Sequence, residues 1–370
     1  MKFLFIVQGE GRGHFTQAIT LEEMLLKNGH EVVEVLVGKS SSRSLPGFFN
    51  RNIKAPVKRF ISPNFLPSAQ NKRVHLGRSV AYNLLHLPAY LKSMQYIKQR
   101  IDESGADVVI NFYELLTGLT YTFLRPRIPY VCIGHQYLFL HKDFEFPRKS
   151  PFSLMMLRFF TRLTSIGCSK RLALSFSKMD DDMHLNIKVV PPLLRREIFS
   201  LQPKQGDYIH GYMVNAGYAD HVLSYHFNHP EQPLHFFWDK PDAPEEMQVT
   251  ENLSFHALND VKFLEYMSGC RAYATTAGFE SVCEAMYLGK PVLMVPAHIE
   301  QDCNAYDAAR AGAGIMADSF ELDRLVEFSE DYIPNRSFVY WVNSCERLLI
   351  EELEKSTDHR LTLAIPAFFN

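Results

Sequence analysis

Four short stretches between residues 275 and 305 decide the fold: TTAGFES at 275–281, CEA at 283–285, GKP at 289–291 and EQDCNA at 300–305. The apolar residues before the first stretch predict a strand, and its small residues predict the tight turn that ends this strand. A helix is expected to begin at the hydroxyl and carboxylate residues that follow, with a second strand after GKP and a polar loop at EQDCNA. A strand, turn, helix and strand in this order are typical of a parallel α/β sheet.

The same order of elements suits a particular ligand. Backbone N–H groups at the beginning of the helix after Gly278 can bind a diphosphate. One turn further, the Glu284 carboxylate can accept hydrogen bonds from two ribose hydroxyls, and the pair Glu300 and Gln301 can hold the hydroxyls of a sugar. The four stretches together therefore predict a site for a sugar nucleotide, whereas each residue alone could equally be an ordinary turn, helix or loop residue.

Size and charge indicate two domains with different partners. A chain of 370 residues with 46% hydrophobic and 22% charged residues fits two ordinary globular domains. Residues 1–190 carry 26 Lys and Arg against 14 Asp and Glu, and residues 191–370 carry 13 against 27. The basic half could attract an anionic acceptor or an anionic lipid surface, or the two halves could simply attract each other. The acidic second half and the lack of a recognisable motif argue against nucleic-acid binding.

Cysteine usage and hydropathy favour a cytoplasmic protein. The six cysteines lie far apart with no C-x-x-C pair, which indicates neither a zinc site nor a disulfide framework. The apolar run at the N-terminus is too short for a signal peptide, and no stretch approaches the length of a membrane span. We therefore expect a cytoplasmic protein, with contact to the inner face of the membrane left open.

Strand and helix patterns alternate in both halves of the chain. The expected strands lie at 3–7, 31–37, 107–111, 129–133, up to 214, 234–238, 253–255, 272–274 and 291–295. This alternation predicts two Rossmann-like, doubly wound parallel sheets that face a cleft, where ligands bind beyond the carboxyl ends of the strands. The expected division is a first domain at 1–190, a linker at 191–205, a second domain at 206–340, and a C-terminal helix and tail at 341–370 that could return to the first domain.

A glycine-rich loop, QGEGRGH at 8–14, follows the first strand. Its G-x-G-x-G spacing differs from the G-x-G-x-x-G of dinucleotide sites, which argues against a nicotinamide or flavin. His14 is expected to begin the next helix and act as a general base, because its unperturbed pKa lies near neutrality. Glu114, after the strand at 107–111, is the predicted carboxylate that orients this base. Either residue could instead serve only its own helix end.

These motifs together resemble a known family. Gly13-His14, Thr276-Ala277-Gly278, Glu284, Gly289-x-Pro291 and Glu300-Gln301-x-x-Asn304-Ala305 are similar to the GT-B glycosyltransferases of families 1 and 28. These families include UDP-dependent natural-product glycosyltransferases and the peptidoglycan lipid-intermediate N-acetylglucosaminyltransferase, and the chain is also similar to a poorly characterised microbial branch. The resemblance is sharp only over about 275–315. It implies a GT-B fold whose first domain binds the acceptor and whose second domain binds the nucleotide sugar.

The resemblance also implies roles for individual residues. The implied donor-binding residues are Gly13, Asn215, Gly217, Phe255, His256, Thr276, Ala277, Gly278, Ser281, Glu284, Glu300 and Gln301. The catalytic candidates are His14 and Glu114, and the acceptor-side candidates are Arg12, Asn111, His135 and Gln136. The family has a basic residue at the position of Thr276, so the backbone from Gly278 to Ser281 would bind more of the diphosphate here.

The implied reaction is transfer of a sugar from a nucleotide donor, of the UDP type, to an acceptor hydroxyl with inversion and without a metal ion or other cofactor. Asp180-Asp181-Asp182 is interpreted as a solvated turn and not as a metal-binding motif. Residues 43–78, Arg148-Lys149 and the run from Phe152 to Arg162 could contact a lipid-linked or anionic acceptor or an anionic membrane, or could be ordinary packing regions. The same architecture would also suit a sugar-nucleotide 2-epimerase or a non-catalytic sugar-nucleotide-binding protein.

Overall fold

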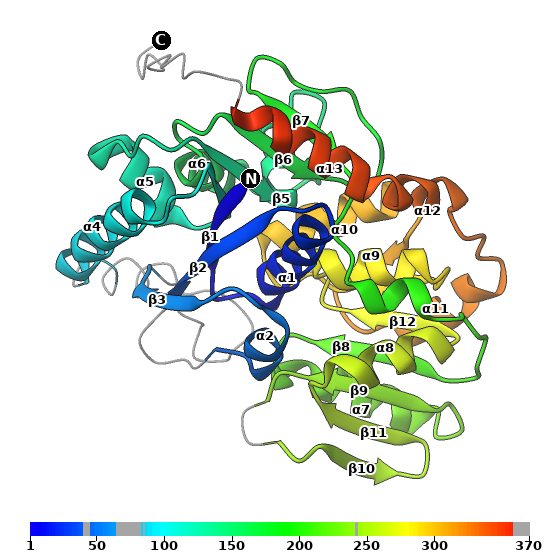
Figure 1. Ribbon diagram of the computed structural model, residues 1–370. Coiled ribbons are helices and arrows are strands. Elements are labelled where there is room, and N and C mark those ends of the chain that lie inside the picture. Colours follow the sequence, from blue (N-terminus) through cyan, green and yellow to red (C-terminus); the bar gives the residue numbers. More distant parts are fainter. Residues whose placement is uncertain (40–44, 64–82, 84–85, 241–242, 358–370) are drawn as a thin grey trace.

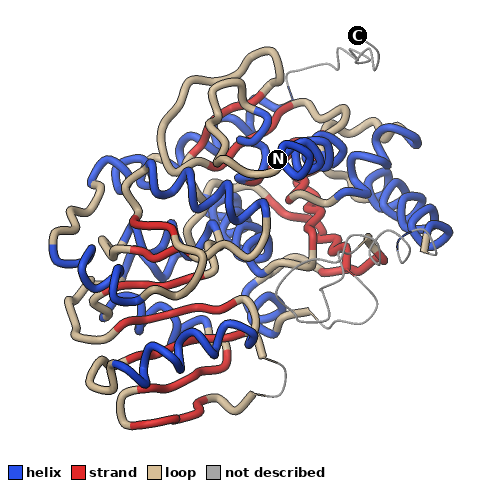
Figure 2. Tube along the Cα trace, turned by 180° about the vertical axis from the view of Figure 1, so that it is seen from behind, coloured by secondary structure: helices blue, strands red, loops and turns tan. Residues whose placement is uncertain are grey.

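The structure, a computed structural model, describes residues 1–39, 45–63, 83, 86–240 and 243–357. These residues form two seven-stranded sheets with helices packed on their faces (Figures 1 and 2). The architecture confirms the predicted fold class of two doubly wound α/β units.

The first sheet is entirely parallel and has the strand order β3-β2-β1-β4-β5-β6-β7. Its strands are β1 (Lys2–Gln8), β2 (Glu31–Lys39), β3 (Val57–Ile61), β4 (Val108–Phe112), β5 (Tyr130–Gly134), β6 (Lys170–Leu174) and β7 (Ile187–Val190). The helices of this unit are α1 (Arg12–Lys27), α2 (Gly47–Asn52), α4 (Leu87–Glu103), α5 (Leu115–Leu124) and α6 (Pro151–Thr164), with a 3-10 helix η1 (His135–Leu140).

The central strand β1 shows why the strands of this half of the chain have uninterrupted apolar sequences. Phe3 and Phe5 belong to the hydrophobic cluster around α1, whereas Leu4 and Ile6 belong to the cluster under α4 on the opposite face. Successive side chains of a strand point to opposite faces, so a strand covered on both sides needs apolar residues at every position.

The second sheet has the order β10-β11-β9-β8-β12-β13-β14. Its strands are β8 (Ile209–Met213), β9 (Leu234–Trp238), β10 (Glu246–Thr250), β11 (Leu253–Ala257), β12 (Ala272–Thr275), β13 (Val292–Met294) and β14 (Gly314–Met316). Its helices are α7 (Ala219–Asn228), α8 (Asp260–Gly269), α9 (Phe279–Tyr287), α10 (Ile299–Arg310) and α11 (Leu322–Glu330), with a 3-10 helix η3 (Ala216–Tyr218).

Two edge strands correct the sequence-based expectation. β10 is antiparallel to β11, so the second sheet is mixed and not wholly parallel. Four of its five residues are exposed, which removes the apolar run that marks a buried strand. The region 43–78, in which no strand was expected, contains β3 and α2, and Phe48 and Phe49 of α2 are buried. Residues 43–44 and 64–78 of that region lie outside the described residues.

The end of the chain crosses back to the first sheet. After β7 the chain passes through a 3-10 helix, η2 (Arg196–Ser200), into the second unit, and α12 (Arg336–Asn343) and α13 (Cys345–Glu354) follow that unit. Helix α13 lies beside α1 (Figure 1). Glu346 of α13 pairs with Lys27 of α1 at 2.8 Å, and the Trp341 indole N–H donates to the Ser175 carbonyl at 3.0 Å. These contacts tie the C-terminal helices to the first unit, at the end of α1 and at the residue that follows β6.

The carboxyl ends of the two sheets meet in a shared hydrophobic cluster. Phe279, the first residue of α9, stacks on His135 of η1 at a centroid distance of 4.1 Å and packs against Phe176 at 4.7 Å. Because the loops after parallel strands all emerge at this edge, the junction gathers polar residues from both halves of the chain.

Candidate active site at the junction of the two sheets

Helix α1 begins directly after β1 and carries His14 on its first turn. The N-cap Gly11 has an extended backbone with φ −110° and ψ 151°. His14 is 7% exposed, and its ring stacks on Tyr113 with the centroids 5.8 Å apart. Burial lowers the pKa of His14 below its usual value, although the nearby Glu300 carboxylate opposes the shift. His14 is therefore neutral at neutral pH, the form that a general base requires.

A short chain of hydrogen bonds leads from His14 into the second unit. His14 Nδ1 lies 3.3 Å from the Gln17 Oε1 atom on the same helix, and Gln17 Nε2 donates to Glu280 Oε1 of α9. Gly13 is needed for this approach, because a Cβ atom at residue 13 would lie 2.2 Å from Glu280 Oε2. Burial raises the pKa of Glu280 to about 7.

The structure corrects the predicted partner of His14. In the part of the chain that the structure describes, no hydrogen bond joins Glu114 to His14. Glu114 is fully buried as the N-cap of α5, where Oε1 accepts from the Leu116 N–H at 3.0 Å and from the Ser62 hydroxyl at 2.6 Å. Burial raises the pKa of Glu114 to about 7. Asn111, predicted on the acceptor side, is also fully buried, and its side chain donates to the carbonyls of Glu114 and Thr164.

The turn before α9 has the geometry of an anion site. Ala277 has a left-handed backbone with φ +60°, which turns the chain sharply after β12. Gly278 is the N-cap of α9 and has no side chain to cap the helix, while the Ser281 hydroxyl donates to the Gly278 carbonyl at 3.2 Å. The first N–H groups of a helix lack partners within that helix, so this end can bind a phosphate.

Thr276 does not face this anion site. Its side chain is fully buried, and Oγ1 accepts a hydrogen bond from the Val214 N–H at 3.2 Å. This contact ties the end of β12 to the end of β8. In the loop after β8, Asn215 Oδ1 accepts from the Gly217 N–H at 2.9 Å and so shapes the turn that begins η3.

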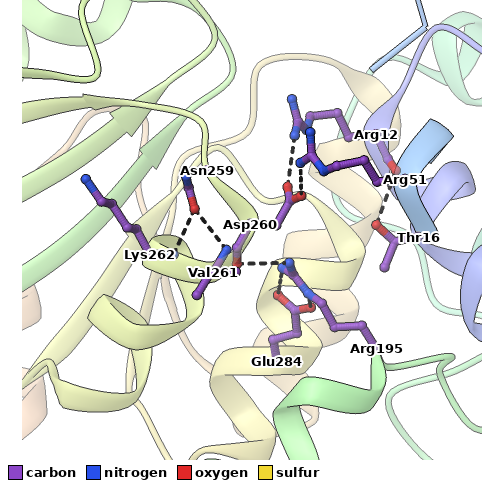
Figure 3. Close-up of polar contacts among 9 residues, drawn as sticks. All are labelled: Arg12, Thr16, Arg51, Arg195, Asn259, Asp260, Val261, Lys262 and Glu284. Atoms are coloured by element: carbon purple, nitrogen blue, oxygen red, sulfur yellow. Dashed lines mark hydrogen bonds and ion pairs between the residues drawn. The ribbon is translucent and has the colours of Figure 1, made fainter. Parts of the chain in front are cut away.

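Glu284, the predicted ribose carboxylate, is held by an arginine. Arg195 Nε and Nη2 donate to the two carboxylate oxygens of Glu284 at 2.6 and 2.9 Å (Figure 3). Glu284 is 1% exposed, and Arg195 comes from the segment between the two sheets. The bidentate contact engages both oxygens of a buried carboxylate, so ribose hydroxyls would compete with the guanidinium for the remaining acceptor sites.

A second ionic contact lies next to this pair. Asp260, the first residue of α8, receives Arg12 Nη2 of α1 at 3.2 Å and Arg51 Nη2 of α2 at 3.9 Å (Figure 3). Its backbone carbonyl lies 3.4 Å from Arg195 Nη1. The predicted acceptor-side residue Arg12 therefore bridges the two units and also lies over the Phe48 ring at 4.7 Å.

The start of α10 supplies the predicted sugar-binding pair. Glu300 Oε1 accepts from Gln136 Nε2 of η1 at 2.9 Å, which brings a predicted donor residue and a predicted acceptor-side residue together across the junction. Gln301 Oε1 accepts from the Ala297 N–H at 2.9 Å and is 7% exposed. Glu300 thus faces the junction, whereas the side-chain oxygen of Gln301 is hydrogen-bonded to the loop that precedes α10.

Three predicted site residues lie in the interior instead. His135 is 1% exposed and stacks on Phe279, and burial lowers its pKa to about 4. The Phe255 ring stacks on Trp238 inside the second unit at 4.5 Å. His256 is buried and lies 2.8 Å from the Ser254 hydroxyl. Both residues belong to β11, which pairs with β10 and β9, and the resemblance assigns the backbone of this segment, not its side chains, to the nucleotide base.

Four residues of the junction were not assigned from the sequence: Gln17, Arg195, Asp260 and Glu280. Gln17 stands three residues after His14, a spacing that places two side chains on one helix face and could have indicated the contact. Glu280 lies inside the TTAGFES stretch but was not assigned a role. The partners of Arg195 and Asp260 lie too far along the chain for spacing to indicate them.

The comparison with protein families identifies the family of the chain. A family model described as Glycosyl transferase family 1 matches residues 1–332, a range that includes both sheets and every junction residue named above. The chain belongs to this glycosyltransferase family, and its two-sheet architecture is the GT-B fold. A protein of Caenorhabditis elegans named as a UDP-glucuronosyltransferase is 26% identical over 92 residues, which are 24% of this chain. The match spans 18% of that protein's length.

Solved structures with the same fold include glycosyltransferases of different kinds. The glycosyltransferase of kitacinnamycin has a TM-score of 0.65 and 16% identity, with 96% of this chain and 98% of that chain covered. UGT2 of Phytolacca americana, complexed with UDP-2-fluoroglucose and pterostilbene, has a TM-score of 0.60 and 11% identity over 97% and 100% of the two chains. MurG of Acinetobacter baumannii has a TM-score of 0.51 and 16% identity over 96% and 100%. At these identities the similarity establishes the fold alone.

Proposed function

We propose that this enzyme transfers a sugar from a UDP-sugar to an acceptor hydroxyl, with inversion at the anomeric carbon and without a metal ion. The observation that carries the proposal is the position of His14 at the N-terminus of α9. The base candidate and the phosphate-binding helix end come from different units, yet one side chain, Gln17, contacts both His14 and Glu280. A neutral base and an anion site therefore lie within one junction.

On the donor side, the N–H groups from Gly278 to Ser281 would bind the diphosphate, Glu284 the ribose and Glu300 the transferred sugar. The helix end offers partial positive charge without a cation, which supports metal-independent binding. The UDP-2-fluoroglucose bound to the Phytolacca americana enzyme of the same fold supports a UDP-sugar as the donor class. Ribose binding would compete with the hydrogen bonds from Arg195 to Glu284.

In the reaction, His14 takes the proton of the acceptor hydroxyl as its oxygen attacks the anomeric carbon. The new C–O bond forms while the bond from that carbon to the diphosphate oxygen breaks, and the electron pair leaves with UDP. Attack from the face opposite the leaving group inverts the configuration. The N-terminus of α9 stabilises the charge that develops on the diphosphate.

For the acceptor, the surface of α6 supports a lipid-linked substrate at the inner face of an anionic membrane. Phe152, Met155, Met156 and Phe159 of this helix are 44–60% exposed. Arg148, Lys149, Arg158 and Arg162 lie on or just before the same helix. Apolar side chains with cations beside them fit an interface of anionic headgroups. Within the described residues no helix has the length and hydropathy to cross a bilayer.

A panel of nucleotide sugars, analysed by mass spectrometry with and without lipid acceptors, tests the proposal. We expect a UDP-sugar to yield UDP together with a glycosylated acceptor or, without acceptor, slow hydrolysis. Epimerised sugar would identify an epimerase, and binding without turnover would identify a non-catalytic binding protein. Either result would overturn the proposed transfer. Chelation of divalent cations should leave the rate unchanged, and a lost rate restored by Mg²⁺ would contradict metal-independence.

A further inference from the structure

The ring of the base candidate His14 is hydrogen-bonded to an amide, whereas the histidine of a catalytic triad is hydrogen-bonded to a carboxylate. Its Nδ1 atom meets Gln17 Oε1 at 3.3 Å, and no carboxylate is hydrogen-bonded to the ring within the described part of the chain. Gln17 is 1% exposed, so its amide has no solvent to satisfy it. Its other end donates to Glu280, which lies 263 residues further along the chain in the second unit. The three side chains form one continuous path across the junction.

The chemistry of this path determines which ring nitrogen of His14 carries the proton. A neutral imidazole has one N–H donor and one acceptor nitrogen, and an amide has one end of each kind. An ionised carboxylate only accepts, so Glu280 must receive the NH₂ end of Gln17. The amide oxygen then faces His14 Nδ1, which must donate. Nε2 is left with its lone pair, free to take a proton.

We propose that Gln17 and Glu280 are positioning residues that hold His14 in the tautomer with the proton on Nδ1. Because Glu280 belongs to the opposite unit, the base is set in this tautomer only while the two units are in contact at α9. The catalytic consequence rests on the proposed function of His14, whereas the tautomer itself does not. The Gln17 amide thereby takes the place that the carboxylate has in a histidine–carboxylate pair, and the Glu280 carboxylate orients this amide.

The close packing at Gly13 supports this assignment. A Cβ atom at that position would occupy the place of the Glu280 carboxylate, so a residue without a side chain is what lets Glu280 lie against α1. Other titratable groups face the path from each packed element. Tyr113 stacks on His14, and the carboxylates of Glu284 and Glu300 raise the pKa of Glu280 further beyond the effect of burial. Since these effects raise the pKa of Glu280 only to about 7, its carboxylate is ionised, and only an acceptor, at pH 8.

Nuclear magnetic resonance of ¹⁵N-histidine-labelled full-length protein at pH 8 tests the tautomer directly. The nitrogen shifts of His14 should show the proton on Nδ1 in the wild type. Gln17→Met and Glu280→Met keep similar volumes but break the path, and each should convert His14 to a mixture of tautomers or to the Nε2-protonated form. Glu23→Met on the same helix is the matched control and should leave the His14 shifts unchanged.

A swap of the two polar groups separates positioning from mere packing. In the double variant Gln17→Glu/Glu280→Gln, the residue 17 carboxylate accepts from Nδ1 and the residue 280 amide donates to it, so the Nδ1 tautomer should return. For catalysis, each Met variant should lower kcat about 10- to 100-fold with the donor KM within about threefold, because a general base contributes about 100- to 10,000-fold. The swap should restore kcat and move its acidic limb to higher pH, since a carboxylate beside His14 raises the pKa of the ring.

An Nε2-protonated ring in the wild type, or an unchanged tautomer in either Met variant, would overturn the proposal. It would also be overturned if Glu280→Met tightened UDP binding strongly while leaving the His14 tautomer intact, because Glu280 would then act on the diphosphate. The spectrum requires no turnover, so it remains decisive if the protein transfers no sugar. Loss of transfer in His14→Ala tests the proposed function separately.

Discussion

Replacing Arg195 by methionine tests whether the ion pair with Arg195 stabilises the buried Glu284 carboxylate before the donor binds. The change retains most of the side-chain volume and removes both hydrogen bonds to the Glu284 carboxylate. Glu284 has a side chain only 2% exposed, so its charge would remain buried without its partner. Removing one member of a buried pair typically costs about 3–5 kcal/mol. Because the Arg195 side chain is 21% exposed and water can partly replace it, we take the lower end, about 3 kcal/mol.

This loss predicts two measurable results. The melting midpoint of the second unit should fall by about 6–12 °C, at about 2–4 °C for each kcal/mol in a unit of this size. UDP should bind at least about tenfold more tightly to the variant, because the ribose no longer has to displace the guanidinium. Scanning calorimetry and titration calorimetry measure the two quantities. Glu284→Gln should instead lose UDP affinity.

The double variant Arg195→Met/Glu284→Met is the control for packing. An apolar pair of similar volume often replaces a buried ion pair with little loss of stability, so its midpoint should return towards that of the wild type. Its UDP affinity should be as low as that of Glu284→Gln, because the ribose carboxylate is gone. The reasoning is refuted if Arg195→Met melts within about 2 °C of the wild type, given the expected loss. It is equally refuted if that variant weakens UDP binding as much as Glu284→Gln, since Arg195 would then be a donor ligand.

Three further outcomes are expected. Gly13→Ala should lower kcat about tenfold or more, because its Cβ would displace the Glu280 carboxylate from α1. Gly11→Ala is the control, because its Cβ would meet nothing within 4 Å and the rate should not change. Equal rates for the two variants would contradict the close approach of Glu280 to Gly13. Burial lowers the pKa of His210 to about 3, so the folded state binds fewer protons than the unfolded state, and the stability from the neutral ring is lost as pH falls from 6.5 to about 3. Between pH 6.5 and 4, the melting temperature of His210→Phe should therefore fall less than that of the wild type. Parallel plots of melting temperature against pH would be inconsistent with this prediction. Phe152→Ser/Phe159→Ser should reduce sedimentation with anionic vesicles but not binding of UDP, and unchanged sedimentation would exclude α6 as the membrane surface.

The strands that could be predicted from the sequence are those buried on both faces. Phe3 to Val7 in β1 and Leu234 to Trp238 in β9 are nearly continuous apolar runs because helices cover both sides of each strand. The edge strands β3 and β10 have no such apolar run. Most of their side chains are exposed or only partly buried, so these positions need not be apolar. The antiparallel direction of β10 depends on its pairing with β11, which no residue pattern within it specifies.

For the site, the sequence was informative about backbone and much less about side-chain partners. The turn at Gly278 follows from small residues between a strand and a helix, and such local geometry can be deduced from neighbouring residues. Arg195 and Glu284 are separated by 89 residues, and Gln17 and Glu280 by 263, so only the packing of the two units brings them together. Thr276 and His256 were assigned by alignment with a family motif, but their side chains are bound within the second unit.

The central claim is that His14 takes the proton of the acceptor in transfer from a UDP-sugar. Single-turnover transfer by wild type and His14→Ala, compared with UDP affinity by titration calorimetry, tests it most directly. We predict that the rate falls at least about 100-fold, the contribution of a general base, while UDP affinity stays within about threefold. A variant that transfers sugar at the wild-type rate would contradict the account.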